Sequence, residues 1–347
     1  MNDKRADKSK PVAIWLLIGI GMLMIQVVLG GITRLTGSGL SITEWAPIMG
    51  TLPPTNTEEW QIAFDKYKQI GQYKFINSDF TLADFKSIYF WEWFHRLWAR
   101  LIALAFAIPF VIFILQKRFR KDMVAPMLIL FLGGALQGAI GWIMVKSGLN
   151  ENDISVSHYR LAIHFIAAMA LISYAVWFAL KLLVPPKEIV TQHFIRKFTT
   201  VLILLLVVQL VYGAFMAGMK AGVVAPTWPT INGEWIPSKT KGTIASDPFL
   251  VQFIHRSLAY LIAILFVVWW VKSKVVGTGM IFRRYRILPF ILVLIQVVIG
   301  IFTVIYSPSR EKLLWLGTVH QFVAMLLLLT MIWMRFMVNG RSFVRAV

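Results

Sequence analysis

Four of the histidines lie in long apolar segments, which is an unusual setting for an ionisable residue. They are His95, His164, His255 and His320. The first belongs to the motif EWFHR, residues 92–96, and the third to the similar motif QFIHR, residues 252–256. Ionisable groups are costly inside a membrane and are retained there mainly where they carry function. The two motifs therefore predict a chemical site in each half of the chain.

The residue types restrict what these sites can bind. The chain has no cysteine, which excludes disulfides, iron–sulfur clusters and metals bound by thiolates. Zinc prefers a third and a fourth ligand, but each half offers only two histidines, with one glutamate added in the first half. Two facing imidazoles inside an apolar bundle suit the axial positions of a haem iron. A single histidine could instead bond a neighbouring helix, but four at corresponding positions favour haem.

Each motif ends in an arginine, Arg96 or Arg256. Guanidinium groups pair well with carboxylates such as the two propionates of haem. Arginines near a membrane surface also extend toward lipid headgroups. The sequence leaves both interpretations open.

The two motifs differ in one carboxylate, because Gln252 stands in the second where Glu92 stands in the first. Glu92 precedes His95 by three positions, so both side chains project from one helix face. An ion pair with Arg96 would be a purely structural role for Glu92. The preferred interpretation is chemical: a carboxyl group beside one haem can deliver protons or stabilise positive charge on the porphyrin, while the other haem relays electrons. We therefore expect Glu92 to be catalytic.

The elements that position these residues are membrane-spanning helices. The chain of 347 residues is 58% hydrophobic, with a mean hydropathy of +0.70. Its apolar runs approach the roughly 20 residues that a spanning helix needs, and they lack the charged face of a helix in a soluble protein. The predicted spans are residues 12–33, 90–115, 124–145, 159–183, 198–219, 250–271, 287–306 and 314–335. The sequence thus predicts an all-α integral membrane protein with eight transmembrane helices.

The net charge of +19 indicates membrane orientation rather than nucleic-acid binding. Lysine and arginine gather beside the spans, in segments 4–10, 117–121, 272–286 and 335–345. By the positive-inside rule both termini are cytoplasmic. The outer connections, 34–89 and 220–249, mix turn-forming and aromatic residues, which predicts compact caps. The N-terminus lacks the cleavage site of a signal peptide, so we expect a multi-pass protein of a bacterial plasma (inner) membrane.

An internal repeat divides the chain. Residues 26–31, QVVLGG, match residues 209–214, QLVYGA, and Trp45 aligns with Trp228 in the outer connections. Residues 137–142, QGAIGW, match residues 296–301, QVVIGI. Each half contains an even number of spans, so both halves enter the membrane from the same side. We expect two pseudo-symmetric four-helix bundles, each with a haem site in its core: residues 1–185 and 186–347.

Several longer motifs are specific enough to identify a family. They include GGITRLTGSGLSITEWAPIMGTLPP, EWFHR, the HF pair at 164–165, TWPTINGEWIP, FIHR and the VHQ at 319–321. They closely resemble the haem A synthase family, in its cysteine-free form from proteobacteria and mitochondria, and the resemblance covers nearly the whole chain. It implies oxidation of the C8 methyl group of haem O to a formyl group by successive hydroxylations, giving the haem A that cytochrome c oxidase needs.

The resemblance also implies roles for individual residues. His95 and His164 would face the substrate haem, with Glu92 as the catalytic carboxylate, while His255 and His320 would ligate a haem b cofactor. Some family members carry a cysteine pair in the outer loops. This chain has none, which excludes a thiol relay there.

The resemblance implies a lipid environment, haem O as substrate, and haem O synthase and cytochrome c oxidase assembly factors as partners, while the electron donor stays unidentified. Two other classes of protein remain as alternatives. A dihaem b-type cytochrome would only transfer electrons, and the difference between Glu92 and Gln252 argues against it. A transporter built on a parallel repeat is disfavoured because the sequence shows no broken helix.

Overall fold

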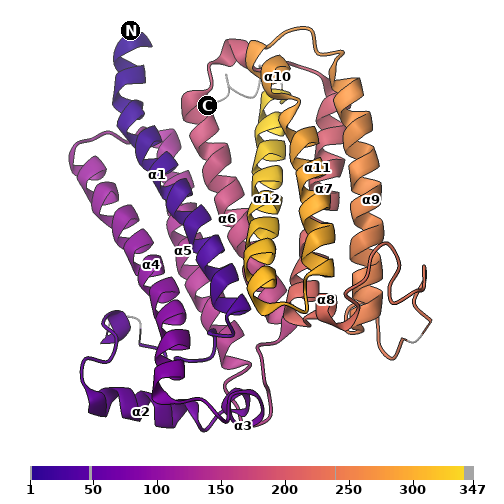
Figure 1. Cartoon of the computed structure of the whole chain (residues 1–347). Coiled ribbons are helices and arrows are strands. Elements are labelled where there is room, and N and C mark those ends of the chain that lie inside the picture. Colours follow the sequence, from indigo (N-terminus) through magenta and orange to yellow (C-terminus); the bar gives the residue numbers. More distant parts are fainter. Residues whose placement is uncertain (1, 47–48, 239, 340–347) are drawn as a thin grey trace.

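The computed structural model describes residues 2–46, 49–238 and 240–339, which form helices joined by loops (Figure 1). Eight helical segments in these ranges are long and apolar enough to cross a membrane, as the sequence predicted. They are α1 (Asn2–Leu35), α4 (Leu82–Leu115), α5 (Lys121–Lys146), α6 (His158–Leu183), α7 (His193–Gly218), α9 (Pro248–Ser273), α10 (Met280–Tyr285) with α11 (Leu288–Ile305), and α12 (Arg310–Met337). Arg341 and Arg345, which contributed to the predicted orientation, lie outside the described residues.

Polar caps determine where several helices begin. The hydroxyl of Thr81 accepts the N–H of Asp84, and the carboxylate of Asp84 accepts the N–H of Thr81 at 2.9 Å. This reciprocal arrangement satisfies N–H groups that a helix start leaves free. Asp247 caps α9 and Ser309 caps α12 in the simpler way. Because its cap lies outside the apolar segment, α4 begins well before the span predicted from hydropathy.

A proline inside α4 creates a link to α1. Pro109 has no N–H, so the carbonyl of Ala105, one turn earlier, lacks its helical donor. The indole Nε1 of Trp15 in α1 donates to this carbonyl at 2.8 Å. The bond fastens α1 to α4 toward the end of the molecule at which α1 begins and α12 ends (Figure 1).

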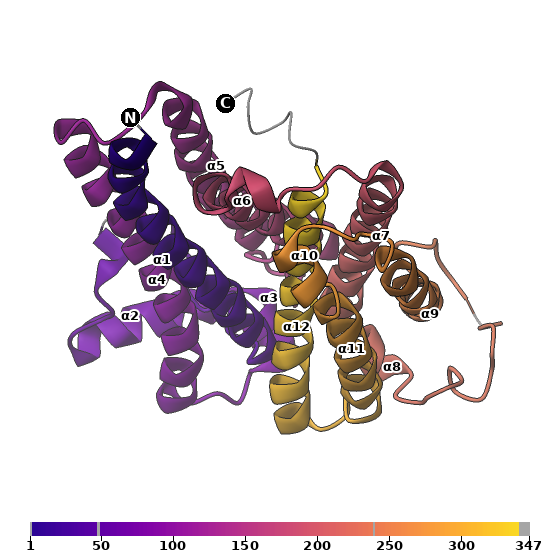
Figure 2. The same cartoon turned by 90° about the horizontal axis from the view of Figure 1, so that it is seen from above.

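The helices of the first half lie beside those of the second (Figure 2). α6 packs against both α7 and α12, and α1 packs against α12. Two hydrogen bonds reinforce these contacts: Gln321 donates to the carbonyl of Val27 at 2.7 Å, and Arg34 donates to the carbonyl of Ala217 at 3.0 Å. The packed interior therefore runs from one half of the chain into the other.

The surfaces of α4 and α5 are apolar and open. Leu104 of α4 is 54% exposed and Leu132 of α5 is 64% exposed, with many apolar neighbours exposed as well. Apolar surface of this extent needs lipid around it, because soluble proteins rarely expose large contiguous apolar patches. The fold is thus that of a protein embedded in a bilayer.

The connection between α1 and α4, which the predicted orientation places on the outer face, contains α2 (Thr57–Tyr67) and α3 (Gly71–Ile76) (Figure 1). Its core consists of Leu40, Phe64, Tyr67, Ile70, Phe85 and Ile88. The hydroxyl of Tyr67 donates to Gln72 at 3.0 Å and accepts from Asn77 at 2.7 Å. Burial raises the pKa of Tyr67 to about 12, so its hydroxyl stays neutral and keeps both bonds.

Candidate functional site

Each of the four membrane histidines lies against a glycine of an adjacent helix. The pairs are Gly30–His95, Gly141–His164, Gly213–His255 and Gly300–His320. A Cβ atom at Gly141 would lie 2.9 Å from Cε1 of His164, and one at Gly300 would lie 2.9 Å from Cε1 of His320. Cβ atoms essentially never come this close to another heavy atom, so a side chain at either glycine would displace the imidazole.

A glutamine precedes each of these glycines by one helical turn and contacts the same histidine. The four are Gln26 of α1, Gln137 of α5, Gln209 of α7 and Gln296 of α11. The sequence alone showed all four segments as repeats, QVVLGG with QLVYGA and QGAIGW with QVVIGI, but gave them no role at the histidines. The pattern Gln-x-x-x-Gly, present once in each odd-numbered span, was the signal that could have found them.

The histidines converge in two pairs. His95 and His164 are close enough to interact electrostatically, and so are His255 and His320. All four side chains are half-buried. Nδ1 of His255 and Nδ1 of His320 are buried and have no hydrogen-bond partner among the described residues.

These donor sets fit haem. Among the described residues, no group of three or more histidines and carboxylates could hold a metal ion, which excludes an ordinary zinc site there. Each half offers two imidazoles with apolar helices around them, and in the second half Nδ1 of both rings is free. Such pairs match the axial ligands that a haem iron takes from a helical bundle. The assignment of His95, His164, His255 and His320 as iron ligands stays a prediction.

Glu92 is 3% exposed and accepts hydrogen bonds from three donors. One carboxylate oxygen accepts from the hydroxyl of Ser41 at 2.8 Å and from the N–H of Ile42 at 2.9 Å. The other oxygen pairs with Arg96 at 2.6 Å. The ion pair that the sequence offered as a structural role is therefore present, and Glu92 also anchors the outer connection to α4. A catalytic role for Glu92 stays a prediction.

In the second half, donor and acceptor are exchanged in the corresponding contact. Gln252 is fully buried and donates its amide N–H to the carbonyl of Ala225 at 3.0 Å. In the repeat, Ala225 corresponds to Ile42, which offers its N–H to Glu92. The outer connection therefore presents a donor to the carboxylate in one half and an acceptor to the amide in the other.

The two arginines hold the outer connections. Arg96 donates to the carbonyls of Glu44 and Ile42, both at 2.9 Å. Arg256 donates to the carbonyl of Thr227 at 2.7 Å. Nε of Arg256 is buried without a hydrogen-bond partner among the described residues, so it remains available as a donor. Binding of a haem propionate by either arginine stays a prediction.

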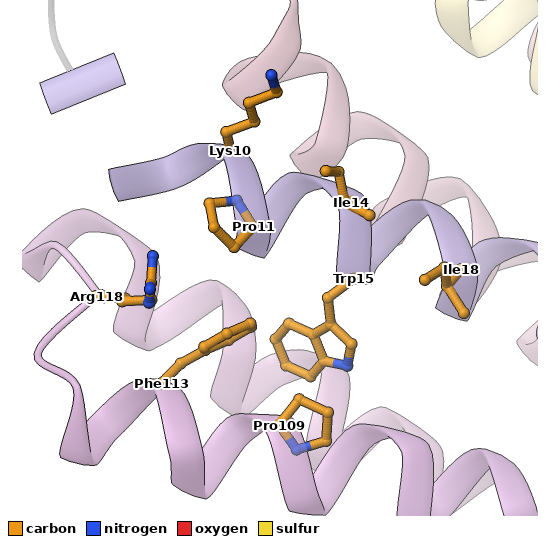
Figure 3. Close-up of a pocket in the computed structure, with 8 residues that line it drawn as sticks. All are labelled: Lys10, Pro11, Ile14, Trp15, Ile18, Pro109, Phe113 and Arg118. Atoms are coloured by element: carbon orange, nitrogen blue, oxygen red, sulfur yellow. The ribbon is translucent and has the colours of Figure 1, made fainter. Parts of the chain in front are cut away.

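A cavity of about 650 Å³ lies away from the histidines, between α1 and α4 (Figure 3). It is lined by Lys10, Pro11, Ile14, Trp15, Ile18, Pro109, Phe113 and Arg118. Except for Arg118, which follows α4, these residues belong to the first half of α1 and the last turns of α4. Gly30 lies in the last turns of α1 and His95 in the first half of α4. The cavity is therefore separate from the candidate haem sites.

Comparison with known proteins covers almost the whole chain. A family model described as COX15-CtaA, cytochrome oxidase assembly protein, matches residues 13–332, which include all four membrane histidines. A protein named heme A synthase from Flavobacterium psychrophilum is 39% identical over 337 residues, covering 93% of this chain and 96% of the relative. Proteins of the same name from Paracoccus denitrificans (38% identical, 91% of this chain and 84% of the relative) and Brucella suis (42% identical, 93% and 91%) are also similar. This extent of similarity shows that the chain belongs to the COX15-CtaA family of cytochrome oxidase assembly proteins.

Proposed function

We propose that the chain is a haem A synthase, which oxidises the C8 methyl group of haem O to a formyl group by successive hydroxylations and so supplies haem A for cytochrome c oxidase. The observation that carries the proposal is the pairing of four histidines in two sites, one of which has Glu92 where the other has Gln252. Membership of the COX15-CtaA family and the similarity to proteins named heme A synthase support it.

The two sites have different tasks in this proposal. Residues 1–185 form a bundle that binds the substrate haem between His95 and His164, and residues 186–347 form a pseudo-symmetric bundle that binds haem b between His255 and His320. The contacts α1·α4 and α5·α6 in the first half, with α7·α9 and α11·α12 in the second, support this division. Each contact joins a helix with a Gln-x-x-x-Gly pattern to a helix with a histidine.

The bound haems supply the iron chemistry that oxidises the methyl group and relays electrons. The residues of the protein hold the substrate in place and control proton transfer at its site. His95 and His164 orient the substrate, and the close glycines keep the imidazoles in place. Glu92 places a carboxyl group three positions before His95 and can exchange protons with the substrate site. Arg96 and Ser41 hold that carboxylate in one orientation.

The alternative function is that of a dihaem b-type cytochrome with electron transfer only. It would use the same four histidines, but it gives no reason for the difference between Glu92 and Gln252. A buried carboxylate with three donors is costly to maintain if both haems have the same task. The synthase proposal explains the difference, because only one of its sites performs chemistry.

We also propose that the protein lies in a bacterial plasma (inner) membrane with both termini in the cytoplasm and the candidate haem sites toward the outer face. Lysine and arginine beside the spans support this orientation. Haem O synthase and cytochrome c oxidase assembly factors are its proposed partners.

The test is conversion of haem O in cells. A host that makes haem O but no haem A is transformed with the chain or with its His164→Ala variant, and total haems are extracted and separated. The parent is expected to yield haem A, and the variant to leave haem O unconverted while both membranes retain haem b. Unconverted haem O in cells with the parent chain, present in the membrane with its haem b, would overturn the proposal.

A further inference from the structure

The four glutamines of the Gln-x-x-x-Gly patterns have an unused acceptor in common. The side-chain oxygens of Gln26, Gln137, Gln209 and Gln296 are all buried and have no hydrogen-bond partner among the described residues. A buried acceptor without a donor costs about 1–3 kcal/mol and is rare in native proteins. Four such atoms at corresponding places indicate a shared purpose.

The amide nitrogens of the same glutamines are engaged with the histidines. Gln137 donates to the carbonyl of His164 at 3.0 Å, and its nitrogen lies 3.2 Å from Nδ1 of that ring. Gln209 donates to the carbonyl of His255 at 3.0 Å and lies 3.4 Å from a ring nitrogen.

The other two glutamines, Gln296 and Gln26, make part of the same set of contacts. Gln296 lies 3.1 Å from a ring nitrogen of His320. Gln26 donates to the carbonyl of His95 at 3.1 Å, with no described contact to the ring. Each amide is thus within reach of one histidine, and three of the four reach the imidazole itself.

Coordination of iron changes the hydrogen bonds that the imidazole ring can make. A neutral imidazole that gives one ring nitrogen to a metal carries its proton on the other, and this N–H requires an acceptor. The amide N–H that lies next to the ring cannot serve, because both groups would be donors. A rotation of the terminal amide group alone exchanges its nitrogen and oxygen, and this torsion is soft. In Gln137 and Gln209 the rotation gives up the bond to the histidine carbonyl in exchange for a bond from the ring N–H.

We propose that Gln137, Gln209 and Gln296 are positioning residues whose amide oxygens accept the ring N–H of the axial histidines when haem is bound, with Gln26 as a weaker fourth member. The proposal rests on the proposed function, because it assumes that these histidines ligate haem iron. It gives the unused oxygens a donor and explains why each glutamine stands one turn from the glycine that admits the imidazole. The glutamines then set the ring orientation and the basicity of each ligand.

The second half allows the cleanest test, through redox titration of haem b in the purified holoprotein. Gln209→Leu removes the acceptor, which weakens the ligand's donation to ferric iron, so the midpoint potential is expected to rise. Gln209→Glu offers a stronger acceptor of similar shape, so the potential is expected to fall. Titration of haem into the apoprotein is expected to show affinity lower by about 10- to 100-fold for Gln209→Leu, the usual effect of losing such a partner.

Gln321→Leu is the matched control. Gln321 adjoins His320 on α12 and also makes a part-buried amide hydrogen bond, but it donates to the carbonyl of Val27 and not to a histidine. Its loss is expected to leave the potential unchanged. If Gln209→Leu does not fold, the isosteric Gln209→Glu and the variant Gln296→Leu still provide the comparison.

The outcomes separate the two proposals. A bis-histidine spectrum with the same midpoint potential in the parent, Gln209→Glu and Gln296→Leu would overturn the glutamine proposal and leave the haem assignment intact. A purified parent that binds haem without a bis-histidine spectrum would overturn the haem assignment and the glutamine proposal together.

Discussion

Replacing Glu92 by glutamine separates the structural role of this residue from its proposed chemical role. The carboxylate accepts from Ser41 and Ile42 through one oxygen and pairs with Arg96 through the other. A glutamine of the same shape keeps one oxygen, which can still accept the bonds of Ser41 and Ile42. Its amide nitrogen would then face the guanidinium of Arg96. Both groups are donors, so no hydrogen bond can form between them.

The stability cost follows from these contacts. Breaking a buried ion pair costs about 3–5 kcal/mol when one charge stays uncompensated. Arg96 keeps its bonds to the carbonyls of Ile42 and Glu44, so we expect a loss near the lower end, about 3 kcal/mol. If Glu92 also acts as a proton carrier, haem A formation falls by about 10²- to 10⁴-fold. Haem O or a hydroxylated intermediate is then expected to accumulate, with haem still bound in both halves.

The assay measures haem A formed per mole of bound haem b, together with thermal unfolding in the same detergent. Ser41→Ala is the control, because it removes one hydrogen bond to the carboxylate and keeps the charge. It is expected to lose about 1.5–3 kcal/mol of stability and to lose far less turnover than Glu92→Gln, because Ile42 and Arg96 still hold the carboxylate. Near-normal turnover per folded molecule in Glu92→Gln would show that the residue acts only through its ion pair, and the catalytic role would have to be withdrawn.

Three further predictions test the sites and the orientation. His255→Ala or His320→Ala is expected to remove the stable haem b spectrum while the protein still inserts, and a full bis-histidine spectrum in both variants would contradict the ligand assignment. Gly141→Ala is expected to weaken haem binding in the first half, because the added Cβ meets His164. The control Gly138→Ala on the same helix has open space around its Cβ and gains up to about 1 kcal/mol of helix stability. Equal haem content in the two variants would refute the steric argument. Single cysteines placed in the outer caps of this cysteine-free chain are expected to react with impermeant reagents only from outside, and labelling from the cytoplasmic side alone would reverse the topology.

The spans and the histidines were predictable because hydropathy and residue type act locally. The eight spans were recognised from apolar runs of bilayer length, and His95 and His255 stood out because ionisable groups are rare in such runs. Helix starts were less predictable, since α4 begins at a cap in the aqueous connection and not where the apolar run begins.

The contacts of the sites were not predictable from one sequence. The bonds of Glu92 to Ser41 and Ile42 join segments far apart in the chain, and nothing in their residue types specifies the partner. The role of Gln137 likewise depends on which face of α5 packs against α6. Spacing shows that Gln137 and Gly141 share a face, but only the packing of the helices shows that His164 lies there.

The central claim is that the chain binds haem O and haem b at separate sites and converts the first to haem A. Mass analysis of the haems extracted from the purified protein, produced together with a source of haem O, tests it most directly. We expect haem b accompanied by haem O, haem A or the hydroxylated intermediate. Haem b alone would contradict it in favour of a dihaem cytochrome, and a protein without haem would contradict both.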